Sequence, residues 1–135
     1  MPFGQAEVKR AGSDVTIVAC GVQVPRALEA ASMLARDDGI DCDVVDPRTL
    51  APLDLGAILA SVRKTGRVVI VHEAPKTGGV GGEIAAIIAE EAIDALQAPV
   101  LRVGGHDTPF PYALEGAYMP NVSRVVDAVT RSAAY

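Results

Sequence analysis

The stretch that decides the fold is residues 54–71, DLGAILASVRKTGRVVIV. Its first part predicts a helix, because Asp54 can serve as the N-cap and the next apolar residues follow the i, i+3, i+4, i+7 spacing of one helix face: Leu55, Ile58, Leu59 and Val62. Gly66 is suited to end that helix. Residues 67–71 then form a continuous apolar strand, of the kind that is buried on both faces of a parallel sheet.

The same alternation of helix and strand extends in both directions from this unit. We expect further strands at 7–10, 14–20, 40–45 and 100–103. We also expect three further helices: one that begins near Pro25, one from about 83 to 96, and one that follows an N-cap at Asn121. Repeated strand–helix units predict an α/β fold of three layers, α/β/α. The sheet should be mostly parallel, with helices on both faces and right-handed crossovers.

The composition is that of one globular domain, which we expect to span residues 1–135. The 135 residues are 50% apolar, enough for one core. A formal net charge of −5 without any basic run argues against a nucleic-acid partner, because neutralising phosphates requires clustered Lys and Arg. No apolar run approaches the roughly 18 residues of a membrane helix, and residues 1–13 do not resemble a signal peptide. We therefore expect a cytoplasmic protein without a membrane partner.

Cys20 and Cys42 are the only cysteines, and each lies in a stretch expected to be a strand. No CxxC motif and no His–Cys cluster is present. The favoured interpretation is two buried thiols in a reducing compartment, rather than a disulfide or a metal pair. The sequence therefore predicts no metal site.

Motifs for nucleotide binding and nucleophilic catalysis are incomplete. Gly79 and Gly81 begin a G-x-G-x-x-G pattern, but Ile84 occupies the third glycine position, so a dinucleotide site is rejected. Ser61 and Lys64 match the S-x-x-K motif of β-lactamases, yet the chain has no S-D-N, and we regard the match as chance. We predict no catalytic and no cofactor-binding residue.

His72 follows the strand at 67–71, at the end where open α/β sheets bind ligands. It could act as a base oriented by Glu73. However, adjacent strand residues point to opposite faces, so we favour a loop anchor that is hydrogen-bonded to the backbone.

A run of glycines precedes the helix expected at 83–96. Free N–H groups at a helix start can bind an anion, and Lys76 and Thr77 lie close by. The favoured interpretation is a tight turn that needs positive φ. The residues of the possible anion-binding loop are Gly78, Gly79, Gly81 and Gly82.

The helix expected at 83–96 is apolar around much of its circumference. A surface helix needs only about 100° of apolar arc, so the excess suggests a second covered side, and hints at self-association. Three acidic residues share the remaining face: Glu83, Glu90 and Asp94. They are a candidate docking patch for a partner, although a solvated face is the favoured interpretation.

Several segments resemble a known family. Residues 46–54, DPRTLAPLD, resemble the D-x-R-T-L-x-P-x-D stretch of transketolase C-terminal domains. Residues 61–75 and 79–86 look like the decarboxylase β subunits of 2-oxo acid dehydrogenase complexes. Residues 98–112, APVLRVGGHDTPFPY, are the most specific segment, and the D-T-P-F-P core resembles the branched-chain enzymes at least as well as the pyruvate enzymes. The resemblance covers nearly the whole chain.

The resemblance implies five strands, one of them an antiparallel edge strand. It also implies a parent oxidoreductase that decarboxylates a 2-oxo acid on thiamine diphosphate with magnesium and then acylates a lipoyl group. The favoured type is 3-methyl-2-oxobutanoate dehydrogenase, of branched-chain amino acid degradation. In that family the cofactor lies between a diphosphate-binding and a pyrimidine-binding domain. This chain has neither domain, so we expect a separated or truncated C-terminal domain that binds no cofactor and is inactive alone.

The resemblance further implies partners. In the family this domain packs against the α subunit and a second β subunit, and it helps to dock the basic subunit-binding module of the acyltransferase. Electrostatic complementarity would chiefly steer that docking.

Three alternatives stay open at this stage. One is the matching domain of a transketolase, a deoxyxylulose phosphate synthase or an indivisible single-chain enzyme, which the D-T-P-F-P segment and residues 72–75, HEAP, argue against. Another is a small anion- or metabolite-binding regulatory module of a transketolase-like enzyme. The third is a small hydrolase that uses His72.

Overall fold

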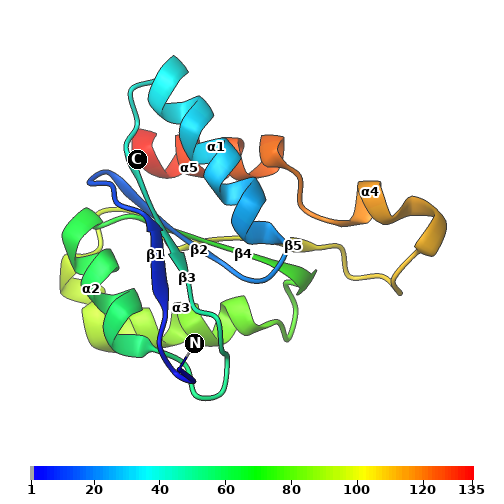
Figure 1. The fold of residues 1–135 in the computed structure, drawn as a ribbon, viewed down its shortest axis with the longest axis horizontal. Helices are drawn as coiled ribbons and strands as arrows, with labels where there is room; N and C mark the ends of the chain where they lie inside the picture. Colours follow the sequence, from blue (N-terminus) through cyan, green and yellow to red (C-terminus); the bar gives the residue numbers. More distant parts are fainter. Residues whose placement is uncertain (1) are drawn as a thin grey trace.

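Five strands form one sheet in the computed structural model, which describes residues 2–135. They are β1 (Glu7–Arg10), β2 (Val15–Ala19), β3 (Cys42–Asp46), β4 (Val68–Pro75) and β5 (Leu101–Gly105). Their order across the sheet is β1-β3-β2-β4-β5 (Figure 1). β1 runs antiparallel to β3, and the other neighbours are parallel. The prediction of a mostly parallel sheet with one antiparallel edge strand is confirmed.

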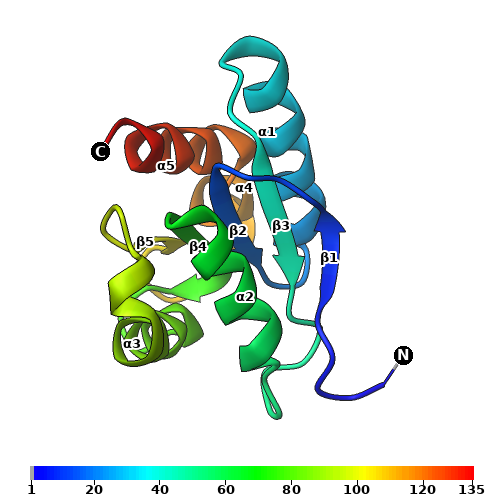
Figure 2. The same ribbon diagram turned by 90° about the vertical axis from the view of Figure 1, so that its left-hand side faces the viewer.

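Four long helices cover the sheet: α1 (Gln23–Asp37), α2 (Leu55–Thr65), α3 (Val80–Ala92) and α5 (Val122–Ala134). α1 and α5 lie on one face, and α2 and α3 lie on the other (Figure 2). The predicted three layers are therefore confirmed. No helix among residues 2–135 is long and apolar enough to cross a membrane.

The central strands bury both of their faces, as the continuous apolar runs predicted. All of β2 is buried, and so are the first five residues of β4. Because successive strand residues point to opposite faces, Ile17 and Val69 join the core beneath α1 and α5, whereas Val18 and Ile70 join the core beneath α2 and α3.

The helix caps expected from the sequence are present. The Asp54 carboxylate accepts a hydrogen bond from the Ala57 N–H at 3.1 Å, and Gly66 ends α2 with a φ of 71°. The Asn121 side chain accepts from the Arg124 N–H at 2.9 Å at the start of α5. These local bonds satisfy N–H groups that the first helical turn leaves without partners.

The helix predicted at 83–96 has different ends. α3 begins at Val80, because Gly79 is already extended as its N-cap and the next two glycines are helical. It ends at Ala92, and a 3₁₀ turn, η1 (Ile93–Ala95), follows. Asp94 therefore lies outside the helix, and the prediction that it shares a helical face with Glu83 and Glu90 is wrong.

Two strands extend beyond their predicted ends. β4 continues from Val71 to Pro75 through a register shift, and Pro75 pairs with Gly105 at the end of β5. A Cβ at Gly105 would lie 2.5 Å from the Glu73 carbonyl oxygen, so only glycine permits this approach. The strand predicted at 67–71 is therefore longer than expected, because β4 runs to Pro75.

The segment from His106 to Pro120, called here the arm, leaves the end of β5 and extends away from the sheet (Figure 1). It contains a 3₁₀ turn, η2 (Tyr112–Leu114), and a short helix, α4 (Glu115–Tyr118). The chain then returns to the sheet as α5.

Candidate functional site at the carboxyl end of the sheet

The carboxyl ends of β2 and β4 form the switch point of the sheet. The chain leaves β2 toward β3 on one side, and later enters β4 on the other side. In open α/β sheets, ligands bind in the crevice outside this point. Cys20 and Gly21 follow β2 here, and the Cys20 N–H donates to the Val71 carbonyl at 3.1 Å. His72 and Glu73 belong to the extension of β4 on the same side.

His72 is a buried anchor of this extension. Its Nδ1 lies 2.9 Å from the Ala74 carbonyl oxygen. Because a carbonyl only accepts, Nδ1 carries the hydrogen and Nε2 is left as the acceptor, without a partner among the described residues. Glu73 is exposed and makes no hydrogen bond to the imidazole. The favoured interpretation, a loop anchor bonded to backbone, is confirmed.

Burial lowers the pKa of His72, and the nearby Arg102 charge lowers it further, while the hydrogen bond to Ala74 acts in the opposite direction. Removing an ionised imidazole from water is costly. The side chain is therefore held neutral inside the protein near neutral pH.

Three glycines pack around the imidazole of His72. A Cβ at Gly79 or at Gly104 would lie 2.9 or 3.0 Å from its Cε1, and a Cβ at Gly81 would lie 2.5 Å from Nε2. Any larger residue would displace the ring. The glycines of this region therefore allow β5, the loop and the start of α3 to pack closely against the buried His72 ring.

The glycine loop is also a tight turn. Gly78 has a φ of 70°. The Gly79 N–H donates to the Lys76 carbonyl at 3.2 Å, and the Gly82 N–H donates to the Gly79 carbonyl at 3.1 Å. The turn expected from the sequence is present, and anion binding by Gly78, Gly79, Gly81 and Gly82 stays a prediction.

The two cysteines are free and have raised pKa values. Burial, together with the Asp46 charge, raises the pKa of Cys20 to about 11. Burial raises the pKa of Cys42 to about 12, against the opposing Arg10 charge. Because the thiolate is the reactive form, neither is a nucleophile. Cys20 does line a cavity of about 430 Å³, between the β2 end and the loop that contains Arg48.

A buried polar cluster joins the sheet to α2, and sequence reasoning did not find it. The Asp43 carboxylate, 1% exposed, accepts hydrogen bonds from Ser61 Oγ, from Lys64 Nζ at 2.8 Å and from the Gly12 N–H at 3.0 Å. Thr16 Oγ1 lies 2.7 Å from Ser61 Oγ. Ser61 and Lys64 therefore share Asp43 as a partner, but Ser61 is buried between the sheet and α2 and cannot reach a substrate. In the sequence, this cluster was indicated only by two polar residues, Thr16 and Asp43, that lie within otherwise apolar strands.

The acidic residues predicted for docking lie apart. Glu83 and Glu90 are exposed on α3. Asp94, in η1, pairs with Arg63 at 3.4 Å. Docking of a partner at these residues stays a prediction.

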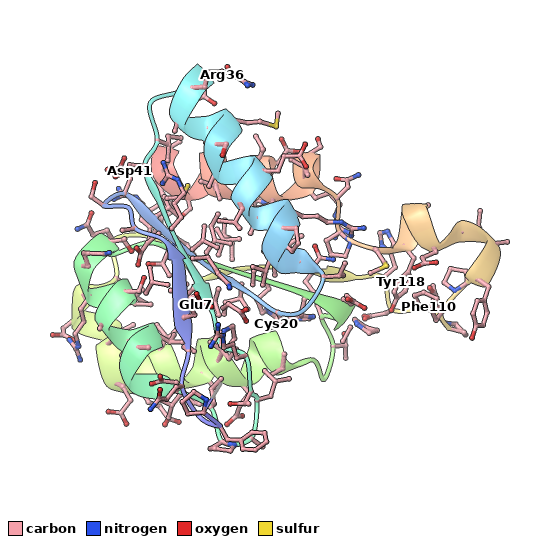
Figure 3. The ribbon with its side chains drawn as sticks, viewed as in Figure 1. Glu7, Cys20, Arg36, Asp41, Phe110 and Tyr118 are labelled. Atoms are coloured by element: carbon pink, nitrogen blue, oxygen red, sulfur yellow. The ribbon has the colours of Figure 1, made fainter. Side chains whose placement is uncertain are left out.

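The arm concentrates the aromatic residues of a chain that has few. It holds three of the five Phe and Tyr residues. Phe110 packs edge-on against Tyr118 at a centroid distance of 5.2 Å (Figure 3). It also packs edge-on against Tyr112 at 5.8 Å. Tyr112 is 90% exposed and Leu114 63%. The arm also borders a cavity of about 230 Å³, lined by His106, Tyr118 and their neighbours.

Within residues 2–135, no group of three or more His, Cys, Asp or Glu side chains is placed to hold a metal ion. The side chains at the carboxyl end of the sheet are thus a neutral buried imidazole, a protonated thiol and exposed carboxylates. Next to them stands an exposed aromatic arm, whose apolar surface is of the kind that protein partners cover.

Comparison with known proteins indicates the same fold. A match to the family described as "Transketolase, C-terminal domain" spans residues 4–125. The chain is 48% identical over 136 residues to "Pyruvate dehydrogenase E1 component subunit beta" of Leifsonia xyli subsp. xyli, covering 100% of this chain and 40% of that protein. It is 47% identical over 135 residues to "2-oxoisovalerate dehydrogenase subunit beta 2, mitochondrial" of Arabidopsis thaliana, covering 100% of this chain and 37% of that protein.

A solved structure described as "Split gene transketolase, inactive beta4 tetramer" superposes with a TM-score of 0.86 at 38% identity, covering 99% of this chain and 43% of that one. The chain spans about two fifths of the length of the curated relatives that it matches. The family match covers most of the chain, and both relatives exceed 45% identity across its whole length. The chain therefore belongs to the transketolase C-terminal domain family.

Proposed function

We propose that this chain is the C-terminal domain of the β subunit of a 2-oxo acid dehydrogenase, and that it serves assembly rather than chemistry. The observation that carries this is the arm. Tyr112 and Leu114 are largely exposed although they are apolar, and together with Phe110 they place three exposed large apolar side chains within five residues of the chain. Exposed aromatic and aliphatic groups beside a small apolar cavity suit a subunit contact, where such residues dominate binding.

The parent enzyme would be an oxidoreductase that performs thiamine-dependent oxidative decarboxylation and lipoyl acylation. A pyruvate and a 2-oxoisovalerate dehydrogenase subunit match this chain at nearly equal identity, 48% and 47%. Between these two, the Asp107–Pro111 segment leads us to propose the branched-chain type. Substrate choice would depend on parts of the enzyme outside this domain.

Two observations argue against a thiamine diphosphate site in the glycine loop. Two of its glycine N–H groups are used within the turn, because the Gly79 N–H donates to the Lys76 carbonyl and the Gly82 N–H donates to the Gly79 carbonyl. His72 fills the space beside them. We therefore propose that the cofactor and its magnesium belong to other domains of the parent enzyme, and that this chain alone has no turnover.

The proposed partners are the α subunit, a second β subunit and the subunit-binding module of the acyltransferase. Glu83 and Glu90 are exposed, and the net charge of −5 would favour approach of a basic module. We propose the cytoplasm as the compartment, because two free cysteines suit a reducing environment.

The test is calorimetric. The chain would be titrated with thiamine diphosphate and magnesium, with the subunit-binding module, and with a complex of the α subunit and the amino-terminal portion of the β subunit. We expect no heat with the cofactor, salt-sensitive binding of the module, and stoichiometric binding of the subunit complex. The reconstituted assembly should then decarboxylate 3-methyl-2-oxobutanoate faster than pyruvate. Tight cofactor binding by the chain alone, or no binding of the subunits, would overturn the proposal.

A further inference from the structure

A groove runs along the open edge of the sheet, between β5 and α5. β5 is the edge strand, paired only with β4. The groove has a volume of about 380 Å³ and follows β5 from Val100 to Val103. Its charged lining consists of Lys76, Arg102, Arg124 and Arg131, with Asp127 as the only carboxylate.

Most of the Lys and Arg side chains that form no ion pair with a described carboxylate line this groove. Of the 12 Lys and Arg residues, six form ion pairs with Asp or Glu side chains: Lys9, Arg10, Arg36, Arg48, Arg63 and Lys64. Four of the six that form none among the described residues line the groove. A protein with a net charge of −5 therefore presents a local excess of positive charge at one sheet edge.

Two of the guanidinium groups are held in place by uncharged partners. Arg102 Nη1 donates to the Lys76 carbonyl at 3.0 Å, and Arg124 Nη2 donates to the Gly104 carbonyl at 2.7 Å. These bonds orient the groups without cancelling their charge. Arg124 Nη1 is buried and makes no hydrogen bond within residues 2–135. A fixed, desolvated N–H donor is suited to a carboxylate, which it binds by a charge-assisted hydrogen bond.

Apart from the Gly104 carbonyl, which accepts from Arg124, most of the β5 backbone has no partner beyond β4 among the described residues. Within the described part of the chain, no backbone hydrogen bond links residues 101–105 to any segment other than β4. An unpaired edge is a template for an added strand. Cations on an edge can also simply prevent aggregation, but that role does not require an oriented, buried N–H group.

We propose that the groove binds an extended acidic segment of a partner polypeptide, which adds a strand to β5 and places its carboxylates on Arg102, Arg124 and Arg131. The backbone of β5 would supply the pairing, and the cations would select for acidic side chains. This inference rests on the groove and does not depend on the proposed dehydrogenase role.

The test uses the 135-residue chain and short synthetic peptides. A peptide of alternating Glu and Val would be titrated into the ¹⁵N-labelled chain, with a peptide of alternating Lys and Val and inorganic phosphate as comparisons. We expect saturable shifts of the amides of β5 and α5 with the acidic peptide only. Slowed hydrogen exchange of β5 amides would accompany them, and binding would weaken as salt is added.

Two double variants distinguish binding in the groove from a general effect of the net charge. Lys76→Gln with Arg131→Gln removes two exposed groove cations whose side chains form no hydrogen bond to any described residue, and should weaken peptide binding about fivefold. Lys9→Gln with Arg36→Gln removes the same charge elsewhere and should leave binding unchanged. No acidic-peptide binding, equal binding of the basic peptide, equal effects of both double variants, or phosphate alone reproducing the shifts without peptide binding would each overturn the proposal.

Discussion

At the scale of single residues, the environment of His72 explains the glycines of the loop that follows it. The ring is bonded to the Ala74 carbonyl on one side and touches Gly79, Gly81 and Gly104 on the others. A glycine-rich loop before a helix is often a phosphate site. Here the close packing of three glycines against the His72 ring accounts for the glycine-rich sequence without a ligand.

We expect Gly81→Ala to destabilise the protein by about 1–3 kcal/mol, because its Cβ would lie 2.5 Å from His72 Nε2 and force the ring to move. Urea unfolding measures the change. Gly82→Ala is the matched control in the same helix, since its nearest contact, Arg102 Nη1, would be at 3.6 Å. That variant should be neutral, or stabilising by up to about 1 kcal/mol. Equal losses in both variants would contradict the packing argument.

His72 should also make stability depend on pH. The pKa of His72 in the folded protein lies below its ordinary value of 6.5. As the pH falls below 6.5, the unfolded chain therefore takes up a proton that the folded protein does not, and stability falls. His72→Gln should flatten the curve of unfolding free energy between pH 8 and pH 5. Superimposable curves for the two proteins would show that the imidazole is not held neutral.

At the scale of elements, polar contacts decide how α2 sits on the sheet. The apolar face of α2 predicts only that it packs on something. The Asp43 carboxylate fixes its position by binding Ser61 and Lys64 of the helix, together with the Gly12 N–H. Buried polar networks of this kind are strong only when every member has a partner.

Asp43→Ala should destabilise the protein by about 2–4 kcal/mol, because the buried Gly12 N–H and Ser61 hydroxyl would both lose a partner. Asp38→Ala removes an exposed carboxylate at the end of α1 and should change stability by less than about 0.5 kcal/mol. Thermal or urea unfolding of both variants gives the comparison. A loss below about 1 kcal/mol for Asp43→Ala would mean that the network contributes little.

The arm is the element that we propose for assembly. Tyr112→Ser should leave the stability of the chain within about 0.5 kcal/mol, because the side chain is 90% exposed. We expect it to weaken binding to the complex of the α subunit and the amino-terminal β portion about tenfold. Tyr135→Ser, at a site that is 76% exposed but lies outside the arm, is the control and should bind normally. If Tyr112→Ser binds like the unaltered chain, the arm is not the contact.

At the scale of the whole molecule, the sheet is covered on both faces, and each face has its own buried cluster. Each face of the sheet is thus packed by residues of this chain. The two surfaces that we propose for partners both border the last strand, since the groove runs along β5 and the arm follows its end. The two proposed binding surfaces thus lie at the margin of the core.

We expect the chain to unfold cooperatively as a single unit, with coincident transitions by far-UV circular dichroism and by hydrogen exchange of the central strands. Addition of thiamine diphosphate and magnesium should not raise the midpoint, because a ligand stabilises only a fold that binds it. A midpoint that rises with cofactor concentration would show a site in this domain. A broad, non-coincident transition would show that other domains complete the core.

The sequence by itself determined the layers, the parallel sheet and the caps of α2 and α5, because helix and strand periodicity and capping are local properties. It also identified the role of His72, since strand alternation separates it from Glu73. Only the tertiary structure decided the start of α3, the Asp43 cluster, the cavities and the cationic groove. These features depend on contacts between residues far apart in the chain, such as Gly12 with Asp43 and Arg124 with Gly104. Local pattern carries no information about which distant groups will meet.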